Sequence, residues 1–269
     1  GAMKVAAVQL AVDDRESKAE RMRRVDGMLD GLRGYDLILL PEMWATGYFS
    51  FHRYAEEAES IDGEFVRRFS GAARRLKAYL FAGSFVEKDR GGNLYNTGVL
   101  FDRSGNLIGR YRKIHLFRYQ SREGDILTPG TEVVTADTEF GRFGIATCYD
   151  LRFPELFRAL LDQGAKHFLV AAAWPHRRLL HWNLLNQARA LENQCFLYSC
   201  NCAGTTESVT LGGHSQIVDP WGTVLASGGE GETTVKAEVD PDEAERIRET
   251  FPQLKDRVFP PAGLIHPIQ

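Results

Sequence analysis

The sequence predicts one α/β domain built on mixed β-sheets, and three observations support this fold class. Short apolar runs alternate with amphipathic stretches along most of the 269 residues, without a low-complexity linker or an internal repeat. Polar turns separate strand-like runs in two places, which indicates that antiparallel pairs accompany the parallel strands of helix-linked units. Hydrophobic residues make up 43% of the chain, enough to bury a sizeable core.

The core strands are expected where apolar residues run together without a polar face. Such runs are typical of strands that are covered on both sides. Pro41 ends the second run, and Cys148 follows directly after the fourth. The runs cover residues 5–10, 37–40, 79–86, 143–147, 167–172 and 195–200.

Helices are expected between these strands, because apolar side chains recur there at helical spacing. Gly34 follows the first helix and Gly164 the third as stop signals, and Pro154 suits the first turn of the third. The expected helices cover residues 22–32, 64–78, 154–163 and 181–193.

Two β-hairpins are expected around polar turns, and a tail without regular structure is expected at the C-terminus. We expect the domain to cover residues 3–250, because four prolines interrupt residues 251–269. The hairpin turns lie at residues 102–106, between runs 93–100 and 107–112, and at residues 219–222, between runs 215–218 and 223–226.

Composition and charge argue against several classes of function. The 33 basic and 36 acidic residues give a formal net charge of −3, which offers no broad attraction to nucleic acid or anionic lipid. No apolar run is long enough to span a bilayer, and the N-terminus lacks the order of a signal peptide. The spacing of the four cysteines fits neither a disulfide framework nor a paired zinc motif, so we expect a cytoplasmic protein without a metal site.

Three reactive side chains follow apolar runs, at the strand ends where open α/β sheets gather their sites. They are Glu42, Lys113 and Cys148. A thiol is a weak nucleophile until it loses its proton, which a carboxylate can accept and later return to a departing amine. An ammonium and the backbone N–H of Tyr149 can stabilise the oxyanion that forms in between. These are the parts that acyl transfer through a thioester needs.

Each of these residues also has a purely structural interpretation. Glu42 could be a surface carboxylate, and Lys113 could be a solvated charge at the end of a hairpin. A cysteine is often a small buried apolar residue. We favour that interpretation for Cys195, Cys200 and Cys202, but not for Cys148, which precedes a helix and has two possible catalytic partners.

Three segments, in this order, connect the residues to a known family. They read Leu-Pro-Glu-Met at residues 40–43, Tyr-Arg-Lys-Ile-His-Leu-Phe at 111–117 and Cys-Tyr-Asp-Leu-Arg-Phe-Pro-Glu at 148–155. The later segments 181–193 and 214–222 add to the match. The chain resembles the nitrilase superfamily of carbon–nitrogen hydrolases over nearly its whole length.

The resemblance implies a role for each residue. Glu42 is then the general base, Lys113 the oxyanion stabiliser and Cys148 the nucleophile. Glu123 takes the place of the family's second glutamate and would orient Lys113, with an ordinary polar loop as the alternative for that position. Similar proteins fold as a four-layer α-β-β-α sandwich with two mixed sheets, need no metal or organic cofactor, and usually form homodimers.

The cysteine segment is most similar to omega-amidases and deaminated-glutathione amidases. Those enzymes act on short amides that also carry a carboxylate, such as 2-oxoglutaramate. A carboxylate needs a cationic or hydrogen-bonding clamp, and Arg152 is the first candidate. The alternative for Arg152 is a structural pair with Asp150 or Glu155.

Three aromatic residues are expected to line the substrate pocket. They are Tyr149, Tyr48 and Trp174, although Tyr48 and Trp174 would serve equally well as packing residues. The sequence leaves other functions open: a carbamoylase or nitrilase of the same superfamily, a non-catalytic binding protein on the same fold, and a thiol redox protein. The last is the weakest, because Cys148 has no cysteine near it in the sequence.

Overall fold

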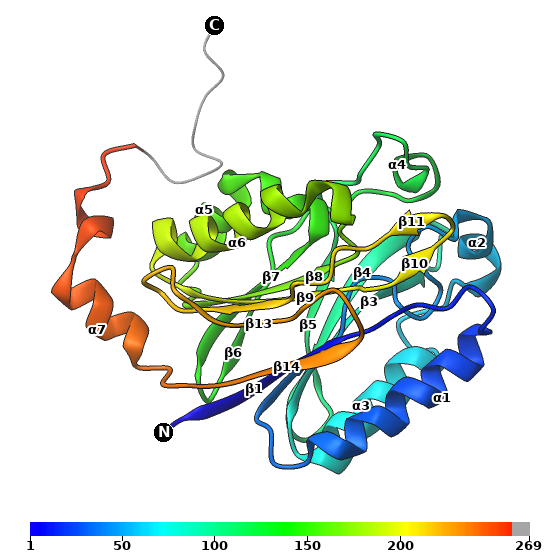
Figure 1. The fold of residues 1–269 in the computed structure, drawn as a ribbon, viewed down its shortest axis with the longest axis horizontal. Coiled ribbons are helices and arrows are strands. Elements are labelled where there is room, and N and C mark those ends of the chain that lie inside the picture. Colours follow the sequence, from blue (N-terminus) through cyan, green and yellow to red (C-terminus); the bar gives the residue numbers. More distant parts are fainter. Residues whose placement is uncertain (260–269) are drawn as a thin grey trace, which may run out of the picture.

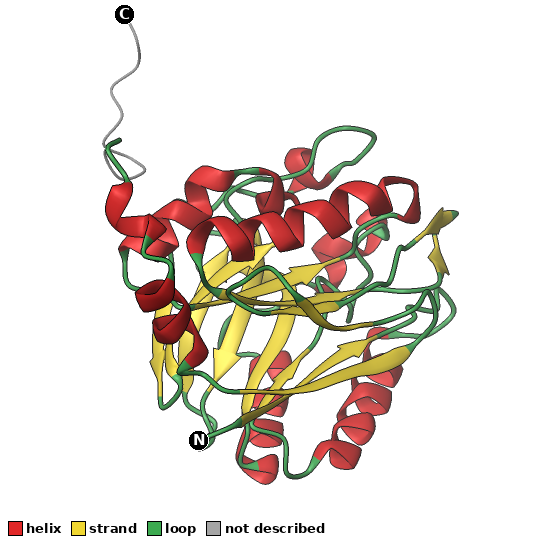
Figure 2. Ribbon diagram, turned by 60° about the vertical axis from the view of Figure 1, so that its left-hand side comes forward, coloured by secondary structure: helices red, strands yellow, loops and turns green. Residues whose placement is uncertain are grey.

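Two six-stranded β-sheets packed face to face form the centre of the molecule. The computed structural model describes residues 1–259. Helices α1 (Lys18–Leu29) and α3 (Glu64–Leu76) cover the outer face of one sheet, and α5 (Pro154–Asp162) and α6 (Leu179–Asn193) cover the other (Figures 1 and 2). This arrangement is the expected four-layer α-β-β-α sandwich.

The first sheet has the strand order β14-β1-β2-β3-β4-β5. Its central strands β1, β2 and β3 are parallel, β4 and β5 continue as an antiparallel meander, and β14 pairs antiparallel with β1. The bounds are β1 (Met3–Gln9), β2 (Leu37–Leu39), β3 (Tyr79–Lys88), β4 (Leu94–Phe101), β5 (Leu107–Arg112) and β14 (Thr233–Val239).

The second sheet has the order β13-β12-β9-β8-β7-β6 and repeats the plan of the first. Parallel strands β7, β8 and β9 form its centre, with antiparallel pairs on both sides. The bounds are β6 (Thr135–Thr138), β7 (Gly141–Thr147), β8 (His167–Ala172), β9 (Phe196–Asn201), β12 (Gln216–Val218) and β13 (Val224–Ser227). In both sheets the parallel centre leaves several strand ends at one edge, where a site can form.

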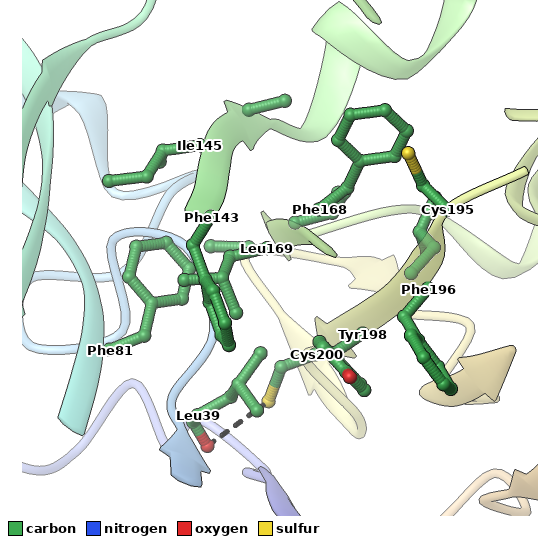
Figure 3. Close-up of a cluster of buried hydrophobic side chains, with 14 of the residues drawn as sticks. Leu39, Phe81, Phe143, Ile145, Phe168, Leu169, Cys195, Phe196, Tyr198 and Cys200 are labelled. Atoms are coloured by element: carbon green, nitrogen blue, oxygen red, sulfur yellow. Dashed lines mark hydrogen bonds between the residues drawn. The ribbon is translucent and has the colours of Figure 1, made fainter. Parts of the chain in front are cut away.

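Apolar side chains of the two sheets fill the space between them. Figure 3 shows Leu39 and Phe81 from the first sheet beside Phe143 and Leu169 from the second, and all four are fully or almost fully buried. Cys200 lies in the same layer, where its thiol donates to the carbonyl oxygen of Leu39 at 3.6 Å. The core therefore joins the sheets into one body that holds the strand ends in place.

The apolar patterns located most of these elements, and β8 has the predicted bounds. Both predicted hairpins are confirmed, as the pairs β4–β5 and β12–β13. The patterns missed the edge strands β6 and β14 and the polar helix α7 (Glu243–Thr250). The smaller elements are α2 (Tyr54–Glu57), α4 (Glu123–Ile126), β10 (Thr205–Thr206) and β11 (Val209–Thr210).

The predicted C-terminal tail is described in part. Residues 253–256 form a short 3₁₀ helix, and residues 260–269 lie outside the described residues. Across residues 1–259, no helix combines the length and the apolar character needed to cross a membrane.

Candidate active site

Four of the predicted site residues meet at one place between the two sheets. The Lys113 ammonium lies 2.9 Å from Glu42 Oε2 and 2.9 Å from Glu123 Oε1, and all three side chains are fully buried. The Glu42 carboxylate and the Lys113 ammonium both lie near enough to the Cys148 thiol to shift its pKa. The structure thus brings a thiol, two carboxylates and an ammonium together, as the chemistry requires.

Glu42 follows a strand of the first sheet and is held by backbone of the second. It follows β2, and its Oε1 accepts from the Ala173 N–H at 3.1 Å, just past the end of β8. Its own N–H donates to the Ala172 carbonyl at 3.3 Å. Gly83 in β3 leaves room for this segment, because a Cβ there would lie 1.9 Å from the Pro41 carbonyl oxygen. The carboxylate is therefore fixed relative to the second sheet, which also carries Cys148.

Cys148 lies at a sharp turn between β7 and a 3₁₀ helix over residues 148–152, and its φ is +46°. A non-glycine residue in this left-handed region is strained, and such strain persists only where the surroundings impose it. Asp150 is part of those surroundings: its buried carboxylate accepts from the Thr147 N–H at 2.9 Å and from the Tyr111 hydroxyl at 2.6 Å. The turn exposes the thiol to the pocket in the manner of other strand-to-helix nucleophile turns.

The same carboxylate ties the Cys148 turn to the Lys113 segment. Asp150 Oδ1 accepts from the backbone N–H of His115 at 3.1 Å and lies 2.7 Å from the His115 Nδ1. The His115 ring in turn stacks on Phe153 with centroids 3.8 Å apart. None of these residues reaches the reacting atoms, so they set the position of Cys148 and of the lysine.

Glu123 begins the short helix α4 and is fully buried, so the alternative of an ordinary exposed loop does not apply. Its Oε1 accepts from the Phe117 N–H at 2.7 Å in addition to Lys113. A hydrogen bond joins the two ends of the segment from Lys113 to Gly130, where the Gly130 N–H donates to the Lys113 carbonyl oxygen at 2.8 Å. A side chain at Gly130 would meet the Arg112 carbonyl oxygen at 2.0 Å, so this close approach requires glycine.

Asn96 is a site residue that the sequence interpretation missed. Its side-chain amide donates to Glu42 Oε2 at 2.8 Å and to Glu123 Oε2 at 2.9 Å, while its carbonyl oxygen is buried without a partner among the described residues. The Asn96 backbone carbonyl also accepts from the Lys113 N–H at 2.8 Å. The side-chain amide therefore donates to both carboxylates. The sequence around a single asparagine within a strand gives no sign of this role.

Burial and charge set the protonation states of the group. Burial raises the pKa of the Cys148 thiol well above its usual range, and the Glu42 carboxylate raises it further, against the opposing effect of Lys113. Burial also raises the pKa of Glu42, with a further rise from Glu123, while Lys113 lowers it. Burial alone would lower the pKa of Lys113, but Glu123 and Glu42 outweigh that effect and raise it well above its usual range. The thiol thus rests protonated beside a carboxylate that can accept its proton, next to an ammonium that stays charged.

A pocket of about 310 Å³ opens above Cys148. All four predicted substrate-binding residues line it: Tyr48, Tyr149, Arg152 and Trp174. Lining residues are Tyr48, Phe49, Phe117, Cys148, Tyr149, Arg152, Ala173, Trp174, Pro175 and Arg178. The pocket is therefore aromatic on several sides and carries two guanidinium groups but no carboxylate.

Arg152 lies in this wall and pairs with neither Asp150 nor Glu155. Its guanidinium lies over the Trp174 ring at 4.7 Å from the centroid, and one of its nitrogens is 3.1 Å from His181 Nδ1. The alternative of a structural ion pair with Asp150 or Glu155 is therefore wrong for this arginine. Its cation remains available to the pocket.

The other three cysteines are buried in the core, as predicted, and all four cysteines are free thiols. Burial raises the pKa of Cys195 to about 12 and keeps Cys200 well above the usual thiol range. Within residues 1–259 no cluster of three or more histidine, cysteine, aspartate or glutamate side chains could hold a metal ion.

Comparison with known proteins decides the family. The family model described as carbon-nitrogen hydrolase matches residues 4–249. The chain belongs to the carbon–nitrogen hydrolase family. Relatives of this family include a 2-oxoglutaramate amidase of Paenarthrobacter nicotinovorans, which is 40% identical over 96% of this chain and 90% of its own length. Omega-amidase NIT3 of Saccharomyces cerevisiae is 34% identical over 96% of this chain and 94% of its own.

The solved structures of carbon–nitrogen hydrolases share the fold. The crystal structure of Saccharomyces cerevisiae Nit3, a member of branch 10 of the nitrilase superfamily, superposes with a TM-score of 0.88 at 33% identity. The superposition covers 96% of this chain and 97% of the yeast chain. The predicted resemblance and the sandwich fold are confirmed, and the chain is an amide-hydrolysing enzyme.

Proposed function

We propose that this enzyme hydrolyses the carboxamide of a small amide that carries a carboxylate at its far end, with 2-oxoglutaramate as the leading substrate. One observation carries the proposal: the Cys148 thiol, with Glu42, Lys113 and Glu123 buried beneath it, opens into a pocket whose wall holds two guanidinium groups. An amide placed on Cys148 would direct its own carboxylate toward those cations. The 2-oxoglutaramate amidase relative supports the same substrate class.

The first half of the reaction forms a thioester. Glu42 accepts the proton of the Cys148 thiol as the sulfur attacks the amide carbon. Negative charge develops on the former carbonyl oxygen, and the Lys113 ammonium with the Tyr149 backbone N–H stabilises it. The tetrahedral intermediate collapses, the carbon–nitrogen bond breaks, and the proton held by Glu42 leaves with the amine as ammonia.

The second half returns the free enzyme. Glu42 removes a proton from water, which attacks the thioester carbon, and the same oxyanion site stabilises the second intermediate. The carbon–sulfur bond breaks, the proton returns to sulfur, and the product carboxylate departs. Glu123 holds Lys113 through both halves, since it accepts from the ammonium with both carboxylate oxygens at 2.9 and 3.2 Å.

Ammonia release from a panel of small amides tests the proposal. We expect the parent to hydrolyse 2-oxoglutaramate faster than glutamine, an N-carbamoyl amino acid or a simple nitrile, and Cys148→Ala to be inactive. Cys202→Ala is the matched control, because it removes another buried thiol, one that lies 3.8 Å from the Glu42 carbonyl oxygen. Carbon dioxide release from the carbamoyl compound, or preferred turnover of the nitrile, would replace this substrate class with a carbamoylase or a nitrilase. A parent inert on the keto-acid amide would overturn the proposal.

We also propose that the enzyme is a homodimer. Helix α6 has large apolar side chains facing outward, and Leu180, Leu184 and Leu191 are 68%, 58% and 50% exposed. Trp221 in the β12–β13 turn is 51% exposed. A second copy of this surface would cover these side chains. Sedimentation of the parent and of Leu184→Glu tests this assignment: we expect a dimer that the charged variant weakens, and a parent that sediments as a monomer would overturn it.

Two further proposals concern the chain and its compartment. The catalytic domain extends over residues 3–250, followed by a tail over residues 251–269, in line with the family match at residues 4–249. The compartment is the cytoplasm, since the four cysteines do not have the spacing of a disulfide framework. Localisation of the tagged protein in its cell of origin tests the compartment.

A further inference from the structure

Arg178 is the second cation of the pocket wall, and nothing in the sequence singled it out. It ends the 3₁₀ helix His176–Arg178, directly before α6. Its carbonyl oxygen accepts from the Trp174 indole N–H at 2.9 Å, and its guanidinium lies over the Phe117 ring at 5.3 Å from the centroid. The backbone and the side chain are thus both fixed at the pocket wall.

The two guanidinium groups have no carboxylate to neutralise them within the described part of the chain. Arg152 is hydrogen-bonded to the His181 ring and lies over Trp174, and Arg178 lies over Phe117. No aspartate or glutamate lines the pocket. Glu42 and Glu123 lie below it and are engaged by Lys113. Burial lowers the pKa of Arg178, and the neighbouring cations Arg177 and Arg152 lower it further.

This charge arrangement attracts one class of substrate and repels another. A planar guanidinium presents paired N–H donors to a carboxylate or to an adjacent keto oxygen. The same cations repel an ammonium group at that end of the substrate, where no carboxylate could pair with it. A wall of two arginines therefore distinguishes amides by the charge at the end that does not react.

We propose that Arg178 completes a two-guanidinium subsite with Arg152, which selects amides of 2-oxo acids and other carboxylates and rejects amides that carry an ammonium at the same end. The inference deepens the proposed function. It explains how the enzyme would distinguish the keto-acid amide from glutamine, whose reacting amide is the same but whose far end carries an ammonium as well as a carboxylate.

Two amides of similar size and opposite charge test the subsite directly. Succinamate and β-alaninamide differ at the far end, where one carries a carboxylate and the other an ammonium. We expect the parent to have the higher kcat/KM for succinamate, and Arg178→Met to reduce the succinamate-to-β-alaninamide ratio about tenfold or more. Arg177→Met is the matched control, because it removes the exposed neighbouring cation outside the pocket wall. It should change the ratio less than about threefold.

A second variant guards against a folding defect. Arg178→Lys keeps the positive charge but loses the paired N–H donors of the guanidinium. It should therefore retain part of the preference for succinamate over β-alaninamide that Arg178→Met loses. An unchanged ratio in folded Arg178→Met, or equal turnover of the two amides by the parent, would overturn the subsite. Failure of the proposed function gives a different result: no hydrolysis of 2-oxoglutaramate, with an Arg178-dependent preference for succinamate intact.

Discussion

The floor and the wall of the pocket carry charge in different ways. The floor is the group of Glu42, Lys113 and Glu123 beneath Cys148, where all three side chains are fully buried and every charge has a partner within hydrogen-bond distance. In the wall Arg152 and Arg178 are half-buried, lie against aromatic rings and have no carboxylate partner among the described residues. Paired buried charges are fixed and set protonation states, whereas an unpaired cation near solvent is ready to receive an anion.

The difference predicts two kinds of mutational effect. A change at the floor removes an interaction that the transition state needs, or leaves a buried charge alone, so it should lower kcat with every substrate. A change in the wall removes binding to the far end of the substrate, so it should act mainly through KM and only for substrates with a charge there.

After loss of the nucleophile itself, the largest effect is expected for Lys113→Met. The variant loses the oxyanion stabiliser, and removal of one such donor lowers kcat about 10²- to 10³-fold. It also leaves Glu42 and Glu123 without their cation, and breaking a buried pair costs about 3–5 kcal/mol of unfolding free energy. Steady-state kinetics and chemical denaturation measure the two effects. Lys88→Met, at the exposed end of β3, is the control and should change neither. A Lys113→Met variant with the kcat of the parent would contradict the role assigned to the floor.

The next effect concerns Asn96, a positioning residue, and its readout is the pH profile. Its amide donates to the ionised forms of Glu42 and Glu123, which favours the carboxylates. Without it the pKa of Glu42, already raised by burial, rises further. As the pH falls, Asn96→Ala should therefore lose its activity at a higher pH than the parent does. Its kcat at the optimum should fall about tenfold or more.

Asn96→Asp sharpens this test. A third carboxylate beside Glu42 and Glu123 raises the cost of ionising all three, so the acid limb should move further to higher pH than in Asn96→Ala. If both variants kept the acid limb of the parent, Asn96 would serve only to pack the strand.

A smaller and substrate-specific effect is expected for Arg152→Met. Loss of a charged hydrogen bond to the substrate carboxylate should raise KM for 2-oxoglutaramate about tenfold or more, because such bonds contribute about 1.5–3 kcal/mol. The measurement compares 2-oxoglutaramate with the neutral amide butyramide, and the ratio of the two kcat/KM values should fall. Equal losses on both amides would show that Arg152 shapes the pocket instead of binding the carboxylate.

The smallest effect is expected for Cys202→Ala. Cys202 is buried, and its thiol lies 3.8 Å from the Glu42 carbonyl oxygen, but it does not line the pocket. The variant should lose about 1 kcal/mol of unfolding free energy through the small cavity and keep the kcat of the parent. Thermal denaturation and kinetics check the two values, and a large fall in kcat would mean that a second thiol takes part in the reaction.

Much of the fold could be predicted from the sequence, because the core strands are runs of apolar residues buried on both faces. Two of the edge strands, β6 and β14, could not. In β14 the side chains alternate in burial and only Val235 and Val239 are buried, so its pattern is weaker than that of β8. Its place beside β1 depends on a pairing between residues more than two hundred positions apart, which no local pattern reports.

The site could be predicted only in part, for a related reason. Glu42, Lys113 and Cys148 were found because family segments surround them, and the structure places them together. Asn96 comes from the middle of β4, where an asparagine has no local signature. Arg178 belongs to a basic run that reads as solvated surface, and its neighbour Arg177 is indeed exposed. What distinguishes Arg178 is the direction of its side chain, which only the three-dimensional structure contains.

The thioester on Cys148 tests the central claim most directly. The enzyme would be mixed with 2-oxoglutaramate, quenched in acid within the first turnover, and measured by intact-protein and peptide mass spectrometry. The account predicts a transient adduct on the peptide that contains Cys148, equal in mass to the acyl group without its amine, and no adduct in Cys148→Ala. Ammonia release by Cys148→Ala at the rate of the parent, with no adduct in either protein, would contradict it.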